Sequence, residues 1–476
     1  MPGARAAVIL LLATLSISLS QAEDKGTVTL TQAIATAIAQ GPDAQLNANA
    51  LATAQQVYNQ AAGANGIGLG LQGSGSHDSN RQASTSNPLY PKNPYDTAGA
   101  SLAITAPNAS ASVTAGHQIS EQTTPLQQAT SIQASGSVTV FDGYGVGPWG
   151  KPAAAVQQAG LTLQGKRLTS RSGLQTIVVN VAQAWWAVLQ AQYNVALQQQ
   201  SLTQQQGALA QVQAQYDNGL ASQLNLRQAQ VDEQTQVQTL AKAQSDLASA
   251  KQSMAVLLGW PVDTGFTAAE AAEPQVPGLE PSALLSTAYA NRADLTQLQL
   301  SIQNANIQLG LARTLARPTV SVNGGYTYSY DWVAGANTTS WNVGANASLS
   351  LYDSGVIASQ VRQAELALAT LQTQQQQLRQ SIAAAVQSGA ANVGNLAALD
   401  SLAQSNLDLA NSQEQLARTN LEQGVGSQLD VLSAVVRTAG AQLALQQARA
   451  NLAIGILNLQ NTLGTVEVPT AGQAGK

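Results

Sequence analysis

The sequence TVSVNGGYTYSYDW, which runs from Thr319 to Trp332, alternates between two kinds of side chain. One set of alternate positions is apolar or aromatic, and the other set is small or polar. Successive side chains of a strand point to opposite sides of a sheet, so this segment predicts a strand with one apolar and one polar face. Such a strand needs partners, and its faces need two different surroundings. Apart from Gly324, the apolar set comprises Val320, Val322, Tyr326, Tyr328, Tyr330 and Trp332.

Three other segments predict strands. WNVGANASLSLY (341–352) alternates in the same way and carries Trp341 and Val343 on its apolar face. The first half of the chain offers GIGLGLQGS, near residues 66–75, and SIQASGSVTVF, at 131–141. The stretch between them, about 76–130, is rich in Ser, Asn, Gly and Pro, and its short runs ASLAITA and ASVTAG give only weak strand signals. We therefore expect four good strands in the chain.

The sequence contains two similar halves, in which matching segments follow one another in the same order. TQAIATAIAQGPD (31–43) resembles SALLSTAYANRAD (282–294), and SGSVTVFDG (135–143) resembles NASLSLYDS (346–354). NGLASQLNLRQA (218–229) resembles QGVGSQLDVLSA (423–434). Three matched blocks in one order predict a duplication. We expect the first repeat at 23–259, an irregular Pro-rich and acidic linker at 260–281, the second repeat at 282–464 and a tail at 465–476.

The positions of proline predict very long helices. No proline occurs between Pro152 and Pro261 or between Pro318 and Pro469, and interior proline breaks helices. Within these windows, apolar residues recur at alternating spacings of three and four, which indicates a coiled-coil seam. A helix of about 60 residues spans about 90 Å. We expect long helices within about 152–258 and 354–463, packed side by side as in the wall of a tube.

The first residues predict export. Residues 1–22 contain one basic residue, a short apolar run and small residues before Glu23, which is the pattern of a cleaved signal peptide. The whole chain carries a net charge of −5, and loss of Arg5 with the signal leaves −6. We expect no nucleic-acid partner, because there is no Lys/Arg cluster. The chain has no Cys, which excludes disulfides, thiolate metal sites and a lipidated N-terminal Cys.

No segment predicts an enzyme or a cofactor site. GVGPWGK (145–151) has the spacing of a phosphate loop, but Pro152 stands where such a loop needs Ser or Thr. We interpret the segment as a connector from strand to helix. His77 and His117 lie in the polar stretch 76–130, where we expect solvated loops, and they are too few for a zinc site. We expect no catalytic residue, no cofactor and no bound metal.

The predicted strands need strands from other chains. No apolar run after the signal is long enough for a transmembrane helix, so entry into a membrane would require a closed barrel. Four strands cannot close one, since the smallest membrane barrels have about eight. A barrel shared between protomers resolves this, with the apolar and aromatic face toward lipid and the polar face toward a lumen. A soluble β-sandwich joined to a coiled coil is the alternative, because alternation alone does not distinguish lipid from protein.

Over nearly its whole mature length, the chain resembles the TolC-like outer membrane efflux protein family. The resemblance rests on the duplicated plan, on the FDG and YDS junctions from strand to helix, and on two segments similar to the family's helix-tip motif, YDNGLASQLNLRQA (216–229) and LEQGVGSQLDVLSA (421–434). It implies an α+β membrane protein, a homotrimer with a twelve-stranded outer membrane β-barrel and a twelve-helix coiled-coil α-barrel in the periplasm. It also implies a passive exit duct of a tripartite efflux or type I secretion system, gated at its periplasmic tip. The partners would be a periplasmic adaptor, an inner membrane transporter and outer membrane lipid.

The resemblance also implies that both helix tips dock the adaptor. A turn alone equally explains the tip glycines, since a reversal of the chain after a helix requires a positive φ. The residues assigned to docking are Gly219, Leu220 and Ser222 in the first tip and Gly424, Val425 and Ser427 in the second.

Asp430 matches an aspartate at the family's tunnel entrance, where three copies would form an anionic ring. Asn225 stands at the corresponding position of the first repeat, and Leu421, Gly426 and Ser433 replace other members of the family's closing network. We therefore expect the closed state to rest on packing and on fewer polar contacts. Asp430 has an alternative role as a cap of the helix after the turn. A second class of function also stays open, a non-conducting coiled-coil stalk that tethers layers of the cell envelope.

Overall fold

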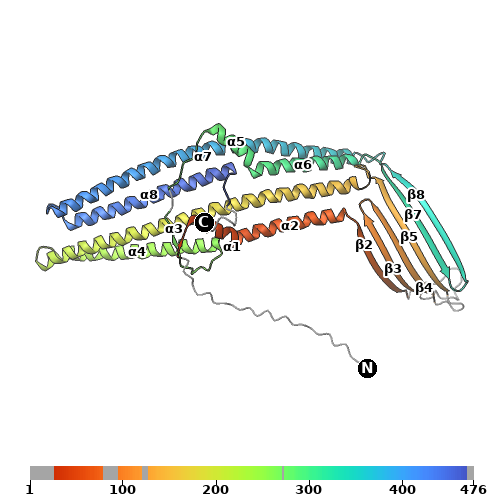
Figure 1. Ribbon diagram of the computed structural model, residues 1–476, viewed down its shortest axis with the longest axis horizontal. Coiled ribbons are helices and arrows are strands. Elements are labelled where there is room, and N and C mark those ends of the chain that lie inside the picture. The colour runs from red at the N-terminus through yellow and green to blue at the C-terminus, as the bar shows by residue number, and fades with distance from the viewer. Residues whose placement is uncertain (1–25, 79–94, 121–126, 271–272, 469–476) are drawn as a thin grey trace, which may run out of the picture.

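The computed structural model describes residues 26–78, 95–120, 127–270 and 273–468. The predicted signal peptide and most of the predicted tail lie outside the described residues. The described part is elongated, with one sheet at one end and two turns between long helices at the other (Figure 1). None of the helices in these ranges combines the length and the hydropathy that a membrane crossing requires.

The two halves of the chain contain matching sets of helices. Each half has an 11-residue helix followed by one of 22 or 23 residues, and then, after its strands, helices of 67 and 36 residues. Equal lengths at equivalent places are what a duplication produces. The helices are α1 Leu30–Gln40, α2 Pro42–Ala64, α3 Lys151–Asp217, α4 Gln223–Leu258, α5 Pro281–Asn291, α6 Ala293–Thr314, α7 Val356–Glu422 and α8 Gln428–Leu463.

The longer helices lie side by side in a layer that is four helices wide (Figure 1). Near the sheet the order across the layer is α7, α6, α3 and α2, and farther from the sheet it is α7, α8, α3 and α4. The 67-residue helices α3 and α7 run through both regions. The layer therefore has α7 at one edge throughout, and α2 followed by α4 at the other.

Two hydrophobic cores lie within the layer, and the first of them also includes Ala450 of α8. In the first half, Trp185 of α3 packs in a cluster with Met254 and Leu258 of α4, and all three are almost fully buried. In the second half, Ile382 of α7 packs in a cluster with Leu459 of α8. Burial of large apolar side chains is the main term that stabilises such contacts, at about 1.5–3 kcal/mol for each side chain. The cores fix the four helices of the layer to one another.

The segment that joins the two halves contains a short strand. Within it, the two-residue strand β6 (Thr267–Ala268) pairs in parallel with β1 (Thr27–Val28) near the start of the described chain. Phe266, next to β6, is buried in the core of the first half. The linker predicted as irregular therefore also covers that core.

Six antiparallel strands form one sheet beyond the helices (Figure 1). Their order across the sheet follows the chain, so every neighbouring pair is consecutive among these strands. β2 and β8 are the two edges. The strands are β2 Gly68–Asp78, β3 Tyr95–Ala106, β4 Ala109–Ser120, β5 Gln127–Phe141, β7 Thr319–Asp331 and β8 Ala336–Ser348.

The prediction of four strands is wrong, because β3 and β4 form a hairpin inside the stretch 76–130. Their alternation is built largely from Ala, Ser, Thr and Gly, whose small side chains give a weak signal in the sequence. The predicted strand 341–352 is also displaced. β8 begins at Ala336, after the turn that contains Gly335, and ends at Ser348, which pairs with Thr319 at the start of β7. Residues beyond Ser348 therefore have no partner on β7.

Candidate functional site: a two-faced sheet and two helix tips

The register of the strands assigns each residue of the sheet to a face. Val322 of β7 stands opposite Val138 of β5 and Ala345 of β8, and Tyr326 stands opposite Trp341. Directly opposite residues of an antiparallel pair share a face. That face is open: 78% of Trp341 is exposed although it is a large aromatic side chain. The predicted apolar residues that lie together on this face are Val320, Val322, Tyr326, Tyr328, Tyr330, Trp341 and Val343.

Trp332 is the last residue of the strand that the sequence predicts, but it lies just outside the observed strand. β7 ends at Asp331, and Trp332 belongs to the turn that follows. Its indole Nε1 donates a hydrogen bond of 2.8 Å to Thr130 Oγ1 of β5, and its ring packs edge-on against Tyr330 with 4.9 Å between centroids. The aromatic group therefore stays beside the sheet, at the end far from the helices.

The two histidines lie in strands, which corrects the expectation of solvated loops. His77 is in β2 and His117 is in β4. His117 Nδ1 is 2.8 Å from Thr130 Oγ1, the hydroxyl that Trp332 also contacts. The described residues contain no group of three or more His, Cys, Asp or Glu side chains that could hold a metal.

The opposite face of the sheet is lined by small polar side chains. Hydroxyl pairs link neighbouring strands at 3.0 Å, as between Ser110 and Ser137 and between Ser112 and Ser135. On the same face, nearer the β8 edge of the sheet, Asn346 Nδ2 donates to Asn323 Oδ1, also at 3.0 Å. These contacts leave one hydroxyl- and amide-rich surface across the sheet, with lone pairs and protons free for water.

An aspartate closes each junction from the sheet into a 67-residue helix. Asp142, which is only 5% exposed, accepts hydrogen bonds from the backbone N–H groups of Tyr144, Gly145 and Lys151. Burial raises the pKa of this carboxyl, but the hydrogen bonds outweigh burial, so the pKa lies below its ordinary value. The GVGPWGK segment is thus a helix entry organised around Asp142. Its equivalent Asp353 accepts from the N–H groups of Gly355 and Ile357 at the start of α7.

The first helix tip is a tight reversal between α3 and α4. Gly219 has a φ of +73°, and its N–H donates to Tyr216 O at 2.9 Å. A β-carbon on Gly219 would meet no atom within 4 Å, so the backbone conformation and not the lack of space requires glycine. Leu220 is 80% exposed and projects from the turn. Ser222 then caps α4 by accepting a hydrogen bond of 3.2 Å from Asn225 N.

The second tip, between α7 and α8, follows the same design with a stronger cap. Gly424 has a φ of +75° in open space, and Val425 is 77% exposed. Ser427 Oγ accepts from Asp430 N at 3.1 Å, while Asp430 Oδ2 accepts from Ser427 N at 2.9 Å and from Ser427 Oγ at 2.7 Å. These hydrogen bonds lower the pKa of the Asp430 carboxyl. The capping role that the sequence left open for Asp430 is therefore present in a single chain, whereas the α4 cap around Asn225 is one-sided.

The three positions that depart from the family's closing network have structural roles here. Ser433 Oγ accepts a hydrogen bond of 3.0 Å from Gln204 Nε2, which ties α8 to α3. A β-carbon on Gly426 would lie 3.0 Å from the backbone nitrogen of Leu421, so the turn leaves little space for a side chain. Leu421 itself lies in the last turn of α7 and is half-buried.

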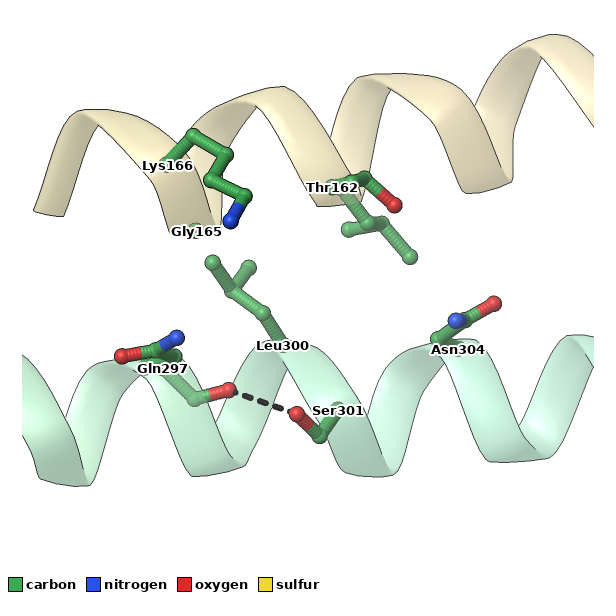
Figure 2. A pocket seen from close by; sticks show the side chains of 8 residues that line it. Thr162, Gly165, Lys166, Gln297, Leu300, Ser301 and Asn304 are labelled. Carbon is green, nitrogen blue, oxygen red and sulfur yellow. Dashed lines mark hydrogen bonds between the residues drawn. The ribbon is translucent and has the colours of Figure 1, made fainter. Parts of the chain in front are cut away.

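A cavity of about 180 Å³ lies between α3 and α6, nearer the sheet than the tips (Figure 2). Figure 2 shows Leu300 pointing toward α3, where Gly165 leaves space, and Ser301 donating a hydrogen bond to Gln297 O at 3.1 Å. Lys166 is the only ionisable residue in the lining. The cavity therefore offers no acid–base pair and lies at a seam between the two halves.

Comparison with known proteins identifies the class. A family model described as outer membrane efflux protein matches residues 33–260 and 284–465, one range in each half. The chain therefore belongs to the outer membrane efflux protein family. Membership confirms the predicted family and outer membrane location, and it agrees with the expectation that the chain is not an enzyme.

Individual relatives are distant in sequence and similar in fold. Outer membrane protein TolC of Escherichia coli (strain K12) is 26% identical over 336 residues, which cover 64% of this chain and 66% of that protein. The aligned part thus spans about two thirds of this relative. The solved structure of VceC from Vibrio cholerae has a TM-score of 0.63 at 19% identity, covering 91% of this chain and 96% of VceC. The open state of the MtrE channel from Neisseria gonorrhoeae has a TM-score of 0.64 at 15% identity, with 92% and 90% covered.

Proposed function

We propose that the protein is the outer membrane exit duct of a tripartite efflux or type I secretion system. Three copies assemble, the number that the family resemblance implies. Their sheets close a shared β-barrel with the apolar face toward lipid, and their helical layers close a twelve-helix tunnel in the periplasm. Solutes cross by diffusion, while selectivity resides in the inner membrane transporter.

The main support is the sheet with two different faces and two unpaired edges. An open edge exposes a row of backbone N–H and C=O groups, which lipid does not tolerate. Closure against the edges of other copies satisfies these groups. The exposed aromatic residues on one face and the hydroxyl-rich surface on the other fit a lipid side and a wet lumen.

A stripe on the edge helix of the layer supports the same assembly. Leu402, Leu409 and Leu416 recur every seven residues along α7, and each is more than half exposed. A heptad of exposed leucines is the seam of a coiled coil that lacks its partner helix. Because α7 is an edge of the layer, the helix at the opposite edge of another copy, α4, is the partner that closes the wall.

The helix tips support docking of a periplasmic adaptor. Leu220 and Val425 are highly exposed apolar side chains at the end of the molecule farthest from the sheet. Isolated exposed apolar residues are ordinary, but here each stands on a turn beside a helix cap and next to glycine. In the proposal the docking surface consists of Gly219, Leu220, Ser222, Gly424, Val425 and Ser427.

Asp430 forms the entrance ring in this proposal, together with its role as a cap. Its Oδ2 atom serves the cap of α8, and the side chain is exposed. An exposed carboxyl is charged near neutral pH, so three copies around a narrow opening would attract cations and repel anions. Asn225 adds no charge to the ring.

The oligomeric state tests the proposal. We expect the protein extracted in mild detergent to have the native mass of three chains and to keep it on dilution, because the barrel closes only between copies. Native mass spectrometry makes the measurement. A stable, well-folded monomer in detergent would contradict the shared barrel and would favour the tethering stalk.

A further inference from the structure

The hairpin β3–β4 is an integral part of the sheet. β3 pairs with β2 along eleven residues and with β4 along twelve, and β4 pairs with β5 along twelve. These ladders are almost as long as the one between β7 and β8, which has thirteen pairs. The hairpin therefore separates β2 from β5 across their whole length.

The hairpin also continues both faces of the sheet. Leu102 and Val113 stand opposite each other, and Val113 stands opposite Ala134, which in turn faces Tyr326. These residues share the open apolar face, where Leu102 and Val113 are exposed. Ser112, next to Val113, shares the polar face with Ser135.

The turn of the hairpin is fastened to the junction between sheet and helices. Asn108 occupies this turn with a φ of +57°, a conformation that asparagine adopts more readily than most residues. Its side-chain amide donates to Gly147 O at 2.5 Å and to Asp142 Oδ2 at 3.2 Å. Its carbonyl accepts from Thr139 N of β5. Two contacts with the entry to α3 and one with β5 hold the hairpin in the plane of the sheet.

Six strands match the width of the helical layer. Strands lie about 4.8 Å apart and tilt by about 35–45° in barrels, so six occupy roughly 38 Å of circumference. Four helices at spacings of 8–10 Å occupy roughly 32–40 Å.

We propose that β3 and β4 lie in the barrel wall, so that the trimer closes eighteen strands and forms a barrel as wide as its helical tunnel. This inference rests on the proposed function and replaces the twelve strands that the family resemblance implies. The wall would not constrict cargo at the membrane. Away from the strand ends, the polar face of the described strands carries no charged residue, so the barrel would favour wide passage of solutes over selection by charge.

Paired cysteine substitutions test the position of the hairpin, since the chain has no cysteine of its own. Val113→Cys and Ser112→Cys report the two faces of β4, and Val322→Cys and Asn323→Cys are the matched pair on β7. Each full-length variant is reconstituted in lipid vesicles and exposed to a membrane-impermeant, water-soluble thiol reagent. The native mass of the wild-type assembly is measured in parallel.

We expect Ser112→Cys and Asn323→Cys to react at similar rates, and each to react about tenfold or more faster than its apolar-face neighbour, because lipid shields the latter. Three chains of six wall strands then give eighteen. Rapid reaction of both β4 variants, with the β7 difference intact, would place the hairpin outside the wall and overturn the inference alone. Loss of the β7 difference as well would overturn the proposed membrane sheet, and with it the inference.

Discussion

At the residue scale, Asp430 combines two roles that a substitution can separate. Its carboxylate completes the cap of α8, and in the assembly it supplies the charge of the proposed entrance ring. Asn225 occupies the same position in α4, where a cap by Ser222 is sufficient to start the helix. Asparagine is therefore compatible with this turn, and Asp430→Asn removes the charge while keeping a residue that the equivalent tip already uses.

We expect Asp430→Asn to abolish the preference of the channel for cations and its block by multivalent cations, with little loss of stability. The reversal potential of single channels in a salt gradient measures this. Asn225→Asp is the matched gain of charge and should increase cation preference. Unchanged selectivity in Asp430→Asn would restrict Asp430 to its capping role.

Asp142 is the residue for which the structure predicts a stability effect. Replacing it with asparagine weakens three backbone hydrogen bonds to a buried carboxylate, which costs about 1–3 kcal/mol. The melting temperature of the detergent-solubilised assembly should fall accordingly. Asp353→Asn is the control, since Asp353 is more exposed and its N–H donors are those of Gly355 and Ile357. An equal loss in both variants would mean that burial of Asp142 has no effect.

The pKa shift of Asp142 sets the sign of its pH dependence. The folded-state pKa lies below the unfolded value, so the charged carboxylate stabilises the fold fully above the unfolded pKa. This stabilisation is lost as pH falls through the lowered folded-state pKa. The difference in melting temperature between wild type and Asp142→Asn should therefore shrink on acidification below the ordinary carboxyl range and remain constant near neutrality.

At the scale of single elements, β7 tests the assignment of the two faces. Val322→Arg places a charge on the apolar face, at a cost of about 2–4 kcal/mol near the middle of a bilayer, and should impair assembly in the membrane. Asn323→Arg places the same charge on the wet face and should be tolerated, although it removes the hydrogen bond with Asn346. The yield of trimer in outer membrane fractions measures both. Equal damage would mean that the faces are misassigned.

The sequence predicts the helices and strands that have a strong hydrophobic periodicity. It does not predict the strands that are built from small residues. The proline-free windows predict α3, α4, α7 and α8, and the alternation of large side chains predicts β7. The hairpin β3–β4 was missed because Ala, Ser and Gly alternate with little contrast in hydropathy. The junction around Asp142 was visible as the FDG motif, but its role depends on contacts with Asn108 and with the start of α3, which no local pattern contains.

The residues assigned to the helix tips also fall into two groups, those that a local sequence pattern predicts and those whose role depends on other contacts. Gly219 and Gly424 were predictable as turn residues, because a positive φ leaves a strong preference for glycine. The capping pair of Ser427 and Asp430 was also recognisable as a motif three residues apart. Contacts with an adaptor involve a second protein, and so neither the sequence nor a single chain determines them.

At the scale of the whole molecule, the open edges of the sheet and the exposed leucines of α7 favour the same assembly. The sheet has two open edges, the layer of helices has a leucine stripe on α7, and both lie on a chain that belongs to an efflux family. In the proposed assembly, further copies of the chain close this wall, and its hydroxyl-rich inner surface encloses water. A tethering stalk would use the same helices, but it would not need the polar face of the sheet.

Single-channel recording in planar bilayers tests the central claim, that the assembled protein is a conducting duct. Purified trimers should produce discrete, uniform and long-lived current steps, because each inserted assembly contributes one continuous aqueous path. Asp430→Asn should preserve the steps and change only their ion preference. Trimers that insert, as verified by protease protection, and yet never conduct would contradict the duct and leave the tethering stalk as the function.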